Sequence, residues 1–527
     1  MAAPLVLINA VGLTCRLLPH APRLSALAQA GWMRPLLEVM PAVTCTAQAT
    51  FLTGKSPQEH GIVGNGWLFR DTGEVRFWQQ SNRLLRAEPI YRTAKKQRAA
   101  QGKSFRCAKL FWWFNQGADV DWSVTPKPYY GADGDKIFAI QGTPEGLTDR
   151  LERSLGPFPF RTFWGPMAGK RSGSLASAGY TCTEWIARSA AEILQREQPD
   201  LMLVYLPHLD YDPQRFGPGF GPQTGGTPVP PHHSSTHHSP THYSPLTSGC
   251  DMPRLVGELD SACAPLLDAA RTVGARVWVV SEYGHVQVSR PVFPNRALRQ
   301  AGLLTVRPGP FGEDLDTFGS QAFAACDHQI AHIYVNDSDD SASAPLRVAA
   351  KHDRGFSIAR VREVIAGLPG VARVLAGNER EEIHLRHERS GDLVALSQPD
   401  AWFAYPFWLD DAQAPDYART VDIHRKPGYD PCELFFDPGL WWPTGRAFLR
   451  LVQKKLGFRT LFDVVPLDAS LVRGSHGLPA VEPGDRPLLI GDGPAPPKGE
   501  MQCSAVHSLL SEALACEDRG SRIEGRA

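Results

Sequence analysis

The chain has 527 residues, enough for roughly two to four domains or for one large α/β core with a second lobe. Hydrophobic residues make up 43% and charged residues 21%, which is typical of a globular protein that buries a sizeable core. The 55 Lys and Arg residues balance the 55 Asp and Glu residues, and this balance excludes a general positive field for holding a nucleic acid polymer or an acidic membrane surface.

The sequence also bears on the compartment. No uninterrupted apolar run approaches the roughly 18 residues of a membrane span, and the N-terminus lacks the basic region of a signal peptide. The 10 cysteines form no CxxC pair, so reduced, buried thiols explain them better than a zinc ribbon or a disulfide framework. We therefore expect a cytoplasmic protein, and its oligomeric state stays open.

Helical patterns alternate with apolar, strand-like runs along the chain. The predicted order is strand 4–11, helix 23–32, helix 185–197, strand 200–206, helix 259–274 and strand 275–284. A helix followed by a short break and an apolar strand is typical of a doubly wound, mostly parallel α/β sheet. Ligands of such sheets bind beyond the carboxyl ends of the strands, which draws attention to the residues after Val204 and Val280.

The segment 219–249 differs from the rest of the chain in composition. It is rich in His, Pro and Ser and has almost no core-forming residue, so it cannot offset its ordering entropy and is expected to be a disordered insertion. Its irregularly spaced histidines indicate adventitious metal binding.

A second lobe is predicted for residues 321–400. Strand-like residues 331–335, an amphipathic helix at 360–370 and a strand at 371–377 precede an expected hairpin of 381–387 and 391–397, a ferredoxin-like α+β order. We assign residues 1–320 to the core, 401–486 to a return into the core, and 487–527 to a Pro/Gly-rich tail with one short helix. The last seven residues, 521–527, contain IEGR and resemble the remnant of a protease-cleavage tag.

The segment MPAVTCTAQATFLTGKSPQEHGIVGNGW, residues 40–67, is the most informative. Pro41 breaks the incoming chain, and Thr44 stands at the start of a helix-prone run. A hydroxyl at a helix N-terminus is usually a cap. It can also be a nucleophile, because the free backbone N–H groups there stabilise a phosphoryl oxygen.

A resemblance to a known family favours the interpretation of Thr44 as a nucleophile over that of a helix cap. The pattern P-x-x-T-x-x-x-x-x-T-x-x-T-G-x-x-P-x-x-H-G-I-x-x-N, from Pro41 to Asn65, resembles the nucleophile region of nucleotide pyrophosphatase/phosphodiesterases in the alkaline phosphatase superfamily. Three later segments fit the same family in order: YLPHLDYDPQRFGP from Tyr205, VVSEYGH from Val279 and LVRGSHG from Leu471. The resemblance implies a doubly wound sheet of alkaline phosphatase type, with a threonine that attacks phosphorus beside two zinc ions.

Carried over by position, the resemblance makes Thr44 the nucleophile, Asp210 and His476 metal ligands, and Asn65 a residue that binds the substrate. Gln214 takes the place of a family His and is expected near the substrate or as a weak ligand. Glu282 takes the place of a metal-binding Asp and is able to ligate.

Other positions depart from the family. Val11 stands where the family has an Asp, Tyr283 follows Glu282 where it has a His, and Ala47 stands where it has an Asn, with Gln48 adjacent. Asp210, Glu282 and His476 therefore leave one divalent ion as the expectation, most simply zinc, with manganese or magnesium as alternatives. Whether Asn9, His208, Gln214 or His285 replaces the missing ligands stays open.

Several other polar or aromatic groups have two interpretations each. Residues 421–430 could contact the substrate or form a salt-bridged loop, and Asp327-His328 favours a structural turn over a metal pair. His60 is expected to order the loop that contains it. The aromatic run 111–115 favours a place in the core over a platform for stacking bases.

The sequence thus predicts a metal-dependent hydrolase of phosphate diesters or pyrophosphates that forms a covalent phosphothreonine intermediate at Thr44. Its substrate would be a phosphorylated small molecule. One alternative is a degenerate, non-hydrolytic member that binds a phosphorylated metabolite or a partner. Another is a related hydrolase of phosphomonoesters, phosphonates or sulfate esters.

Overall fold

The computed structural model describes residues 3–132, 136–168, 181–219, 249–336, 354–441 and 460–523, and residues 445–446, 449–450, 452–453 and 456 of the segment between the last two. Within these ranges, only the backbone is described for 354–357 and 516–523. The interior of the predicted insertion, 220–248, and the last four residues of the predicted tag remnant lie outside the described residues.

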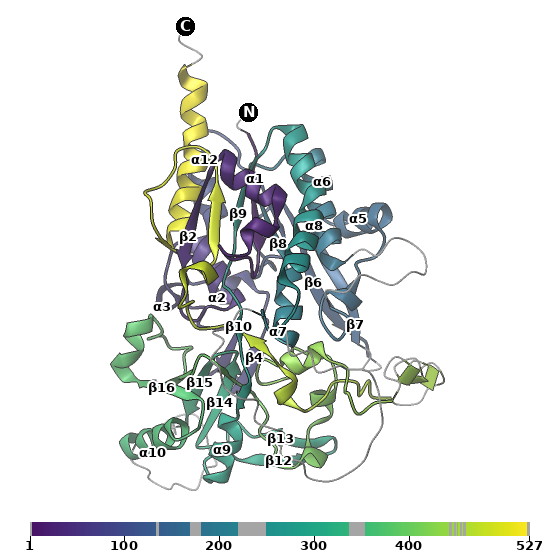
Figure 1. Ribbon diagram of the computed structural model, residues 1–527, viewed down its shortest axis with the longest axis vertical. Coiled ribbons are helices and arrows are strands. Elements are labelled where there is room, and N and C mark those ends of the chain that lie inside the picture. Colours follow the sequence, from purple (N-terminus) through teal and green to yellow (C-terminus); the bar gives the residue numbers. More distant parts are fainter. Residues whose placement is uncertain are drawn as a thin grey trace.

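A nine-stranded sheet forms the larger lobe, and its five central strands, from β9 to β6, run parallel (Figure 1). Only β20 and β7 run antiparallel to their neighbours. The order is β21 (Met501–Gln502), β2 (Trp32–Leu37), β20 (Leu488–Gly491), β9 (Arg276–Val280), β1 (Leu5–Ala10), β8 (Leu201–Leu206), β5 (Cys107–Leu110), β6 (Trp122–Tyr130) and β7 (Lys136–Thr143). The predicted mostly parallel sheet is confirmed.

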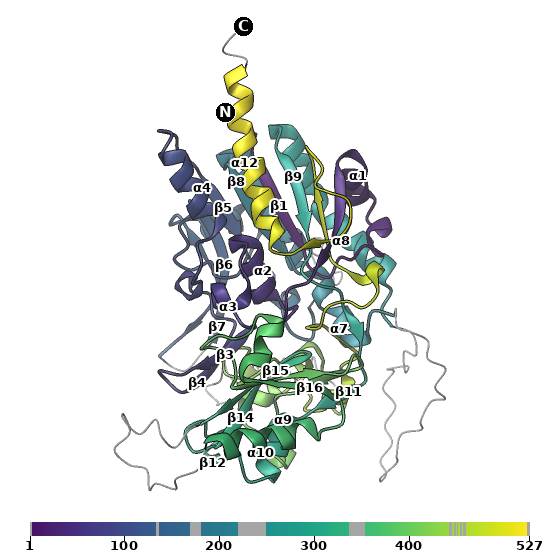
Figure 2. The same ribbon diagram turned by 90° about the vertical axis from the view of Figure 1, so that its left-hand side faces the viewer.

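Helices cover both faces of this sheet (Figure 2). One layer consists of α2 (Thr44–Thr53), α4 (Ile90–Ala99) and α12 (Ala505–Ile523), and the other of α1 (Pro22–Ala30), α5 (Leu147–Leu155), α6 (Cys182–Glu197) and α8 (Met252–Val273). Alternate side chains of β1 point to the two layers, since Leu5 and Leu7 join the first core and Val6 and Ile8 the second. A strand buried on both faces has to be apolar throughout, which explains the continuous apolar run from which this strand was predicted.

The C-terminal segment predicted as a tail contributes to the core. Leu488–Gly491 form β20 between β2 and β9, and the predicted short helix is α12, which runs to Ile523 and so includes the first three residues of the predicted tag remnant. The Pro/Gly-rich composition gave no sign of this strand.

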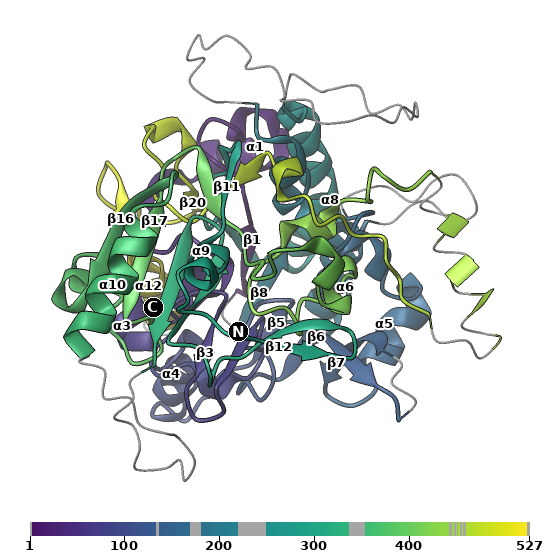
Figure 3. The same ribbon diagram turned by 90° about the horizontal axis from the view of Figure 1, so that it is seen from below.

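The smaller lobe contains a four-stranded antiparallel sheet in the order β14 (Ala322–Asp327), β15 (Ile330–Val335), β17 (Leu393–Ser397) and β16 (Val371–Ala376). Helices α9 (Pro294–Gln300) and α10 (Arg354–Ala366) belong to the same lobe (Figure 3). The expected α+β lobe is therefore present. The first arm of its predicted hairpin, 381–387, was wrong, because Gly377–Ile383 form the 3-10 helix η5, whose Glu379 accepts a hydrogen bond from the Ala376 amide.

Short elements make up the rest of the described chain. The helices are α3 (Pro57–His60) and α7 (Asp212–Phe216), and the paired strands are β3 (Gly66–Phe69) with β4 (Glu74–Phe77), β10 (Val286–Gln287) with β19 (Gly474–Ser475), β11 (Arg290–Val292) with β18 (Ala401–Phe403), and β12 (Val306–Gly309) with β13 (Gly312–Leu315). The remaining 3-10 helices are η1 (Leu18–His20), η2 (Asn82–Leu84), η3 (Phe160–Thr162), η4 (His208–Asp210), η6 (Asp411–Gln413), η7 (Asp416–Arg419), η8 (Pro431–Leu434), η9 (Ala469–Leu471) and η10 (Pro483–Asp485). Among the described helices, none combines the length and the apolar character needed to cross a membrane.

Candidate active site

Thr44 is the first residue of α2 and is almost completely buried. The extended conformation of Val43 starts the helix at this point, so the Thr44 hydroxyl lies at the positive end of the helix dipole. The hydroxyl lies 2.8 Å from the phenol oxygen of Tyr283. Thr44 therefore combines a helix N-terminus with a hydrogen bond that fixes the direction of its side chain.

Asn65 is hydrogen-bonded to the first turn of α2. Its side-chain oxygen accepts a hydrogen bond from the Cys45 amide at 3.0 Å, and its side-chain nitrogen donates to Asp327 at 3.0 Å. Asp327 also accepts from the Asn65 backbone at 2.7 Å. The predicted substrate-binding residue thus lies beside the nucleophile, with its amide group bonded to protein atoms.

Asp210 follows β8 at the carboxyl end of the sheet, where the strand order predicted a site. The Tyr283 hydroxyl donates to its Oδ1 at 3.1 Å. The amide nitrogen of Gln214 donates to the same oxygen at 3.1 Å and to the Asp210 carbonyl at 2.7 Å. Because the Gln214 oxygen accepts from Tyr429, Gln214 fixes the carboxylate and its own acceptor is in use.

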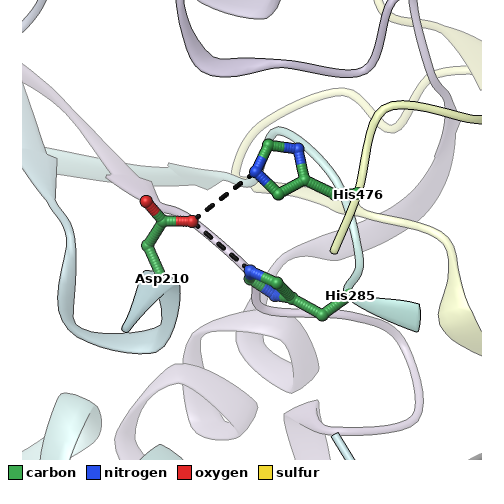
Figure 4. A group of neighbouring side chains, drawn as sticks. All are labelled: Asp210, His285 and His476. Carbon is green, nitrogen blue, oxygen red and sulfur yellow. Dashed lines mark ion pairs between the residues drawn. The ribbon is translucent and has the colours of Figure 1, made fainter. Parts of the chain in front are cut away.

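Two histidines face this carboxylate (Figure 4). Nε2 of His285 lies 3.3 Å and Nε2 of His476 lies 3.8 Å from Asp210 Oδ1, and the three ligand atoms lie within 4.8 Å of one another. Both rings are buried, and both Nε2 atoms lack a hydrogen-bond partner among the described residues. Nδ1 of His476 lies 2.8 Å from the Ala42 carbonyl, to which it donates, so Nε2 keeps its lone pair.

This group fits a divalent cation. Burial lowers the pKa of His476 well below its usual value and so keeps the ring in the neutral form that binds metal. Two imidazole nitrogens and one carboxylate oxygen match the protein ligands of a catalytic zinc site. The unpartnered nitrogens would gain a partner from such an ion.

Glu282 lies outside the group formed by Asp210, His285 and His476. Its Oε1 accepts from Asn9 at 2.5 Å and from Gln48 at 2.7 Å. Burial is the main cause that raises the pKa of Glu282 to about 8. The structure therefore places Glu282 in a hydrogen-bonded cluster under the site, where a neutral carboxyl is favoured.

The structure brings Thr44, Asp210, His476 and Gln214 together and adds His285, which the sequence gave only as an alternative. His208, another alternative, is not part of this group, and its Nε2 lies 3.2 Å from the Glu258 carboxylate of α8. The only sequence signal for His285 was its place two residues after Tyr283.

Two further sequence interpretations concern the histidines His328 and His60. His328 has a positive φ of 59° in the turn between β14 and β15, as a structural turn requires, and its ring packs 3.7 Å from that of His476. His60 orders its loop as expected, because its ring nitrogens lie 3.1 Å from Thr50 Oγ1 and 3.1 Å from the Ile62 amide.

A cavity of about 360 Å³ opens on Thr44 and Asp210. The loop 421–430 is salt-bridged, because Asp422 and Lys426 form ion pairs, and some of its residues line the cavity, so that contact with a substrate stays a prediction. Trp113 of the aromatic run lies in the wall, whereas most of that run is buried. The wall members of the loop are Val421, Ile423 and His424.

The chain is similar to known proteins in its sequence pattern and in its fold. The model of the family described as type I phosphodiesterase / nucleotide pyrophosphatase matches residues 5–430. Murine ectonucleotide pyrophosphatase / phosphodiesterase 5 is similar with a TM-score of 0.51 and 15% identity, over 97% of this chain and 95% of that chain. An inactive form of that murine protein in complex with AMP gives a TM-score of 0.52 at 15% identity, over 98% and 95% of the two chains.

Phosphonoacetate hydrolase from Sinorhizobium meliloti, in complex with phosphonoformate, gives a TM-score of 0.51 at 14% identity, over 97% of this chain and 96% of that chain. No curated protein sequence matches the chain. At these identities the solved structures show a shared fold, and they confirm the α/β architecture of alkaline phosphatase type that the resemblance implied.

Proposed function

Because the chain belongs to the type I phosphodiesterase / nucleotide pyrophosphatase family, we propose that it is a metal-dependent hydrolase of phosphate diesters or pyrophosphates with Thr44 as its nucleophile. One observation carries this proposal. The hydroxyl of Thr44, at a helix N-terminus, is linked through Tyr283 to the same Asp210 oxygen that faces His285 and His476. Thr44 and Asp210, one member of the proposed ligand set, thus line the same cavity.

Each of these residues has a separate role in the proposed reaction. Asp210, His285 and His476 would hold one divalent cation, and Gln214 and Tyr283 would fix the carboxylate of Asp210. A divalent cation at this position supplies a lowered pKa for the nucleophile and neutralises phosphoryl charge. The donor set favours zinc, although manganese bound to the same groups would serve the same purpose.

Thr44 Oγ1 would release its proton to solvent and attack phosphorus, forming a P–O bond to the enzyme while the bond to the leaving group breaks. The leaving group takes up a proton from solvent. A water molecule then attacks phosphorus, breaks the bond to Thr44 and restores its hydroxyl. The positive end of the α2 dipole, at Thr44, would stabilise the phosphoryl oxygens during both steps.

Hydrolysis of phosphonates is the second candidate, because phosphonoacetate hydrolase shares the fold over nearly its whole length. A non-hydrolytic binding protein is the outcome that would replace both. Assays on bis(4-nitrophenyl) phosphate, 4-nitrophenyl phosphate, an aryl phosphonate and an aryl sulfate separate the reaction types.

The decisive experiment combines turnover with metal content. We expect Thr44→Ala to lower turnover by roughly 10⁴-fold or more and to keep its cation, and Asp210→Ala to lose both. Unchanged turnover in Thr44→Ala would remove the proposed nucleophile. Protein without bound metal and without turnover on any of these substrates would favour the binding protein.

The histidine-rich insertion has to be removed before metal is counted. The backbones of Gly219 and Gly249 touch, since a Cβ added to Gly249 would lie 2.3 Å from the Gly219 nitrogen, and the Cys250 amide donates to the Gly217 carbonyl at 2.9 Å. A deletion of residues 220–248 can therefore be joined directly. Metal that remains in this shortened protein belongs to the site at Asp210.

A further inference from the structure

The cavity at Thr44 is lined mainly by apolar side chains, many of them aromatic. Its volume of about 360 Å³ lies within the range of about 300–1,000 Å³ for small-molecule sites. The wall is built from the β6–β7 hairpin, from segment 160–167 and from residues 421–424. Aromatic members of the wall include Trp78, Trp113, Phe138, Phe160, Phe163 and Trp164.

Several polar groups of this wall are already bonded to the protein. Nζ of Lys136 lies 2.9 Å from Asp422, and the indole nitrogen of Trp164 donates to Glu433 at 2.5 Å. Burial lowers the pKa of His424, whose ring is hydrogen-bonded to the backbone of Phe77. A sugar or a base placed against these three groups would have to compete with the bonds that they already make, which is unfavourable in a desolvated cavity. The other polar members of the wall away from the reaction centre are Gln80, Lys127 and Arg161.

The apolar surface continues from the cavity onto the hairpin. Phe138 lines the cavity and is 50% exposed, and its neighbour Ile137 is 58% exposed. Tyr129, paired with Ile137 across the hairpin, is 45% exposed. Because neighbouring side chains of a strand point to opposite faces, Ile137 and Tyr129 lie on the other face of the hairpin, and Phe138 carries the apolar cavity wall to the surface.

We infer that the substrate is an amphiphilic phosphate or phosphonate ester, whose phosphoryl group lies at Thr44 and whose large apolar group fills the cavity and reaches the β6–β7 hairpin. The inference rests on the proposed function for the location of the phosphoryl group. It adds the class of the ester group: an alkyl or extended aromatic group in place of a nucleoside.

Binding measured without turnover tests this inference separately from the proposed function. Methyl-, butyl- and octylphosphonic acid, each below its micelle concentration, are titrated into the protein by calorimetry, with a naphthylmethylphosphonic acid as the aromatic probe. We expect the affinity to rise about threefold to fourfold for each added methylene group until the cavity is filled. AMP serves as the polar comparison, and we expect octylphosphonic acid to bind more tightly than AMP.

Matched variants locate the effect. Phe138→Ala should weaken the binding of octylphosphonic acid severalfold and leave methylphosphonic acid unchanged, because only the longer chain reaches this ring. Ile137→Ala, next to it and outside the cavity lining, should change neither affinity. Ile423→Phe should narrow the cavity and exclude the octyl chain alone.

Equal affinity for the three alkylphosphonic acids, or tighter binding of AMP than of the octyl and naphthyl probes, would overturn the inference. Either result leaves the proposed function intact if Thr44→Ala abolishes turnover of a nitrophenyl ester. Conversely, a protein without turnover can still show the dependence on chain length, so the two failures are distinguishable.

Discussion

Replacement of Glu282 with Gln tests how the site is divided between cation ligands and supporting groups. The sequence placed Glu282 among the ligands, whereas the structure bonds its Oε1 to Asn9 and Gln48. Gln keeps the size of the side chain and an oxygen for both donors. Its new amide group would replace the unpartnered Oε2 and could donate to the unpartnered Oδ1 of Asn9. We therefore expect Glu282→Gln to fold and to keep one cation per chain.

The same variant should become more stable than the native protein as pH rises, when both are metal-free. Below pH 4.5 the Glu282 carboxyl is protonated in the folded and the unfolded chain, so it contributes no penalty. Between pH 4.5 and about 8 the unfolded chain loses this proton and the folded chain retains it, so the native protein loses stability as pH rises. The raised pKa of Glu282 lowers the unfolding free energy of the native protein by at most about 5 kcal/mol at and above pH 8.

Urea unfolding followed by tryptophan fluorescence measures this difference. Chelator-treated native protein and Glu282→Gln are compared at about pH 5 and about pH 9, and the gap in unfolding free energy should widen by several kcal/mol in favour of the variant. Metal analysis of untreated protein gives the second measurement, with Asp210→Asn as the control that loses its cation. A gap that does not change with pH, together with loss of the cation from Glu282→Gln, would show that Glu282 is a ligand.

The remaining predictions concern the histidines and the tyrosine. His285→Ala should weaken cation binding by more than about 10- to 100-fold, whereas His208→Ala, which loses only its contact with Glu258, should bind the cation normally; equal affinities would refute the assignment. Tyr283→Phe keeps the ring stacked 3.7 Å from that of His476 but loses the hydroxyl that holds Thr44, so kcat should fall about 10²-fold with cation content and thermal stability nearly unchanged. Chelation should abolish turnover of the native protein, and zinc or manganese should restore it; turnover that resists chelation would contradict a metal-dependent reaction.

The strands that carry the site could be predicted because their environment leaves a simple pattern. β1, β8 and β9 lie in the middle of the sheet with both faces covered, so they appear as continuous apolar runs bounded by polar residues. β20 lies in the same sheet but has only four residues, within a segment rich in Pro and Gly. Its position between β2 and β9 is set by tertiary pairing, which local composition does not encode.

Tertiary pairing also limits how much of the group Asp210, His285 and His476 could be predicted from the sequence. Asp210 and His476 lie in motifs with fixed neighbours, and the resemblance located both. His285 reaches them because β10 pairs with β19, which sets Val286 opposite Ser475 and brings His285 beside His476. This ladder joins segments far apart in the chain and has only two residues on each side, so no sequence pattern announces it.

The residues that replace the expected family ligands are each accommodated by the protein. Val11 is buried in the core, Gln214 is bonded to Asp210 and Tyr429, and Tyr283 is bonded to Thr44 and Asp210. Gly12, with a φ of 77°, leaves room for the new histidine, since a Cβ there would lie 3.3 Å from the His285 ring.

Unlike the bonded side chains of Gln214 and Tyr283, the two Nε2 atoms that face Asp210 are buried without a hydrogen-bond partner in the described part of the chain. A buried polar atom without a partner costs about 1–3 kcal/mol, and a cation shared by His285 and His476 would remove that cost at both Nε2 atoms. A site that had only lost its ligands would have no reason to keep two such atoms aimed at one carboxylate. The arrangement therefore favours a rebuilt site for one cation over a binding protein that has lost its metal.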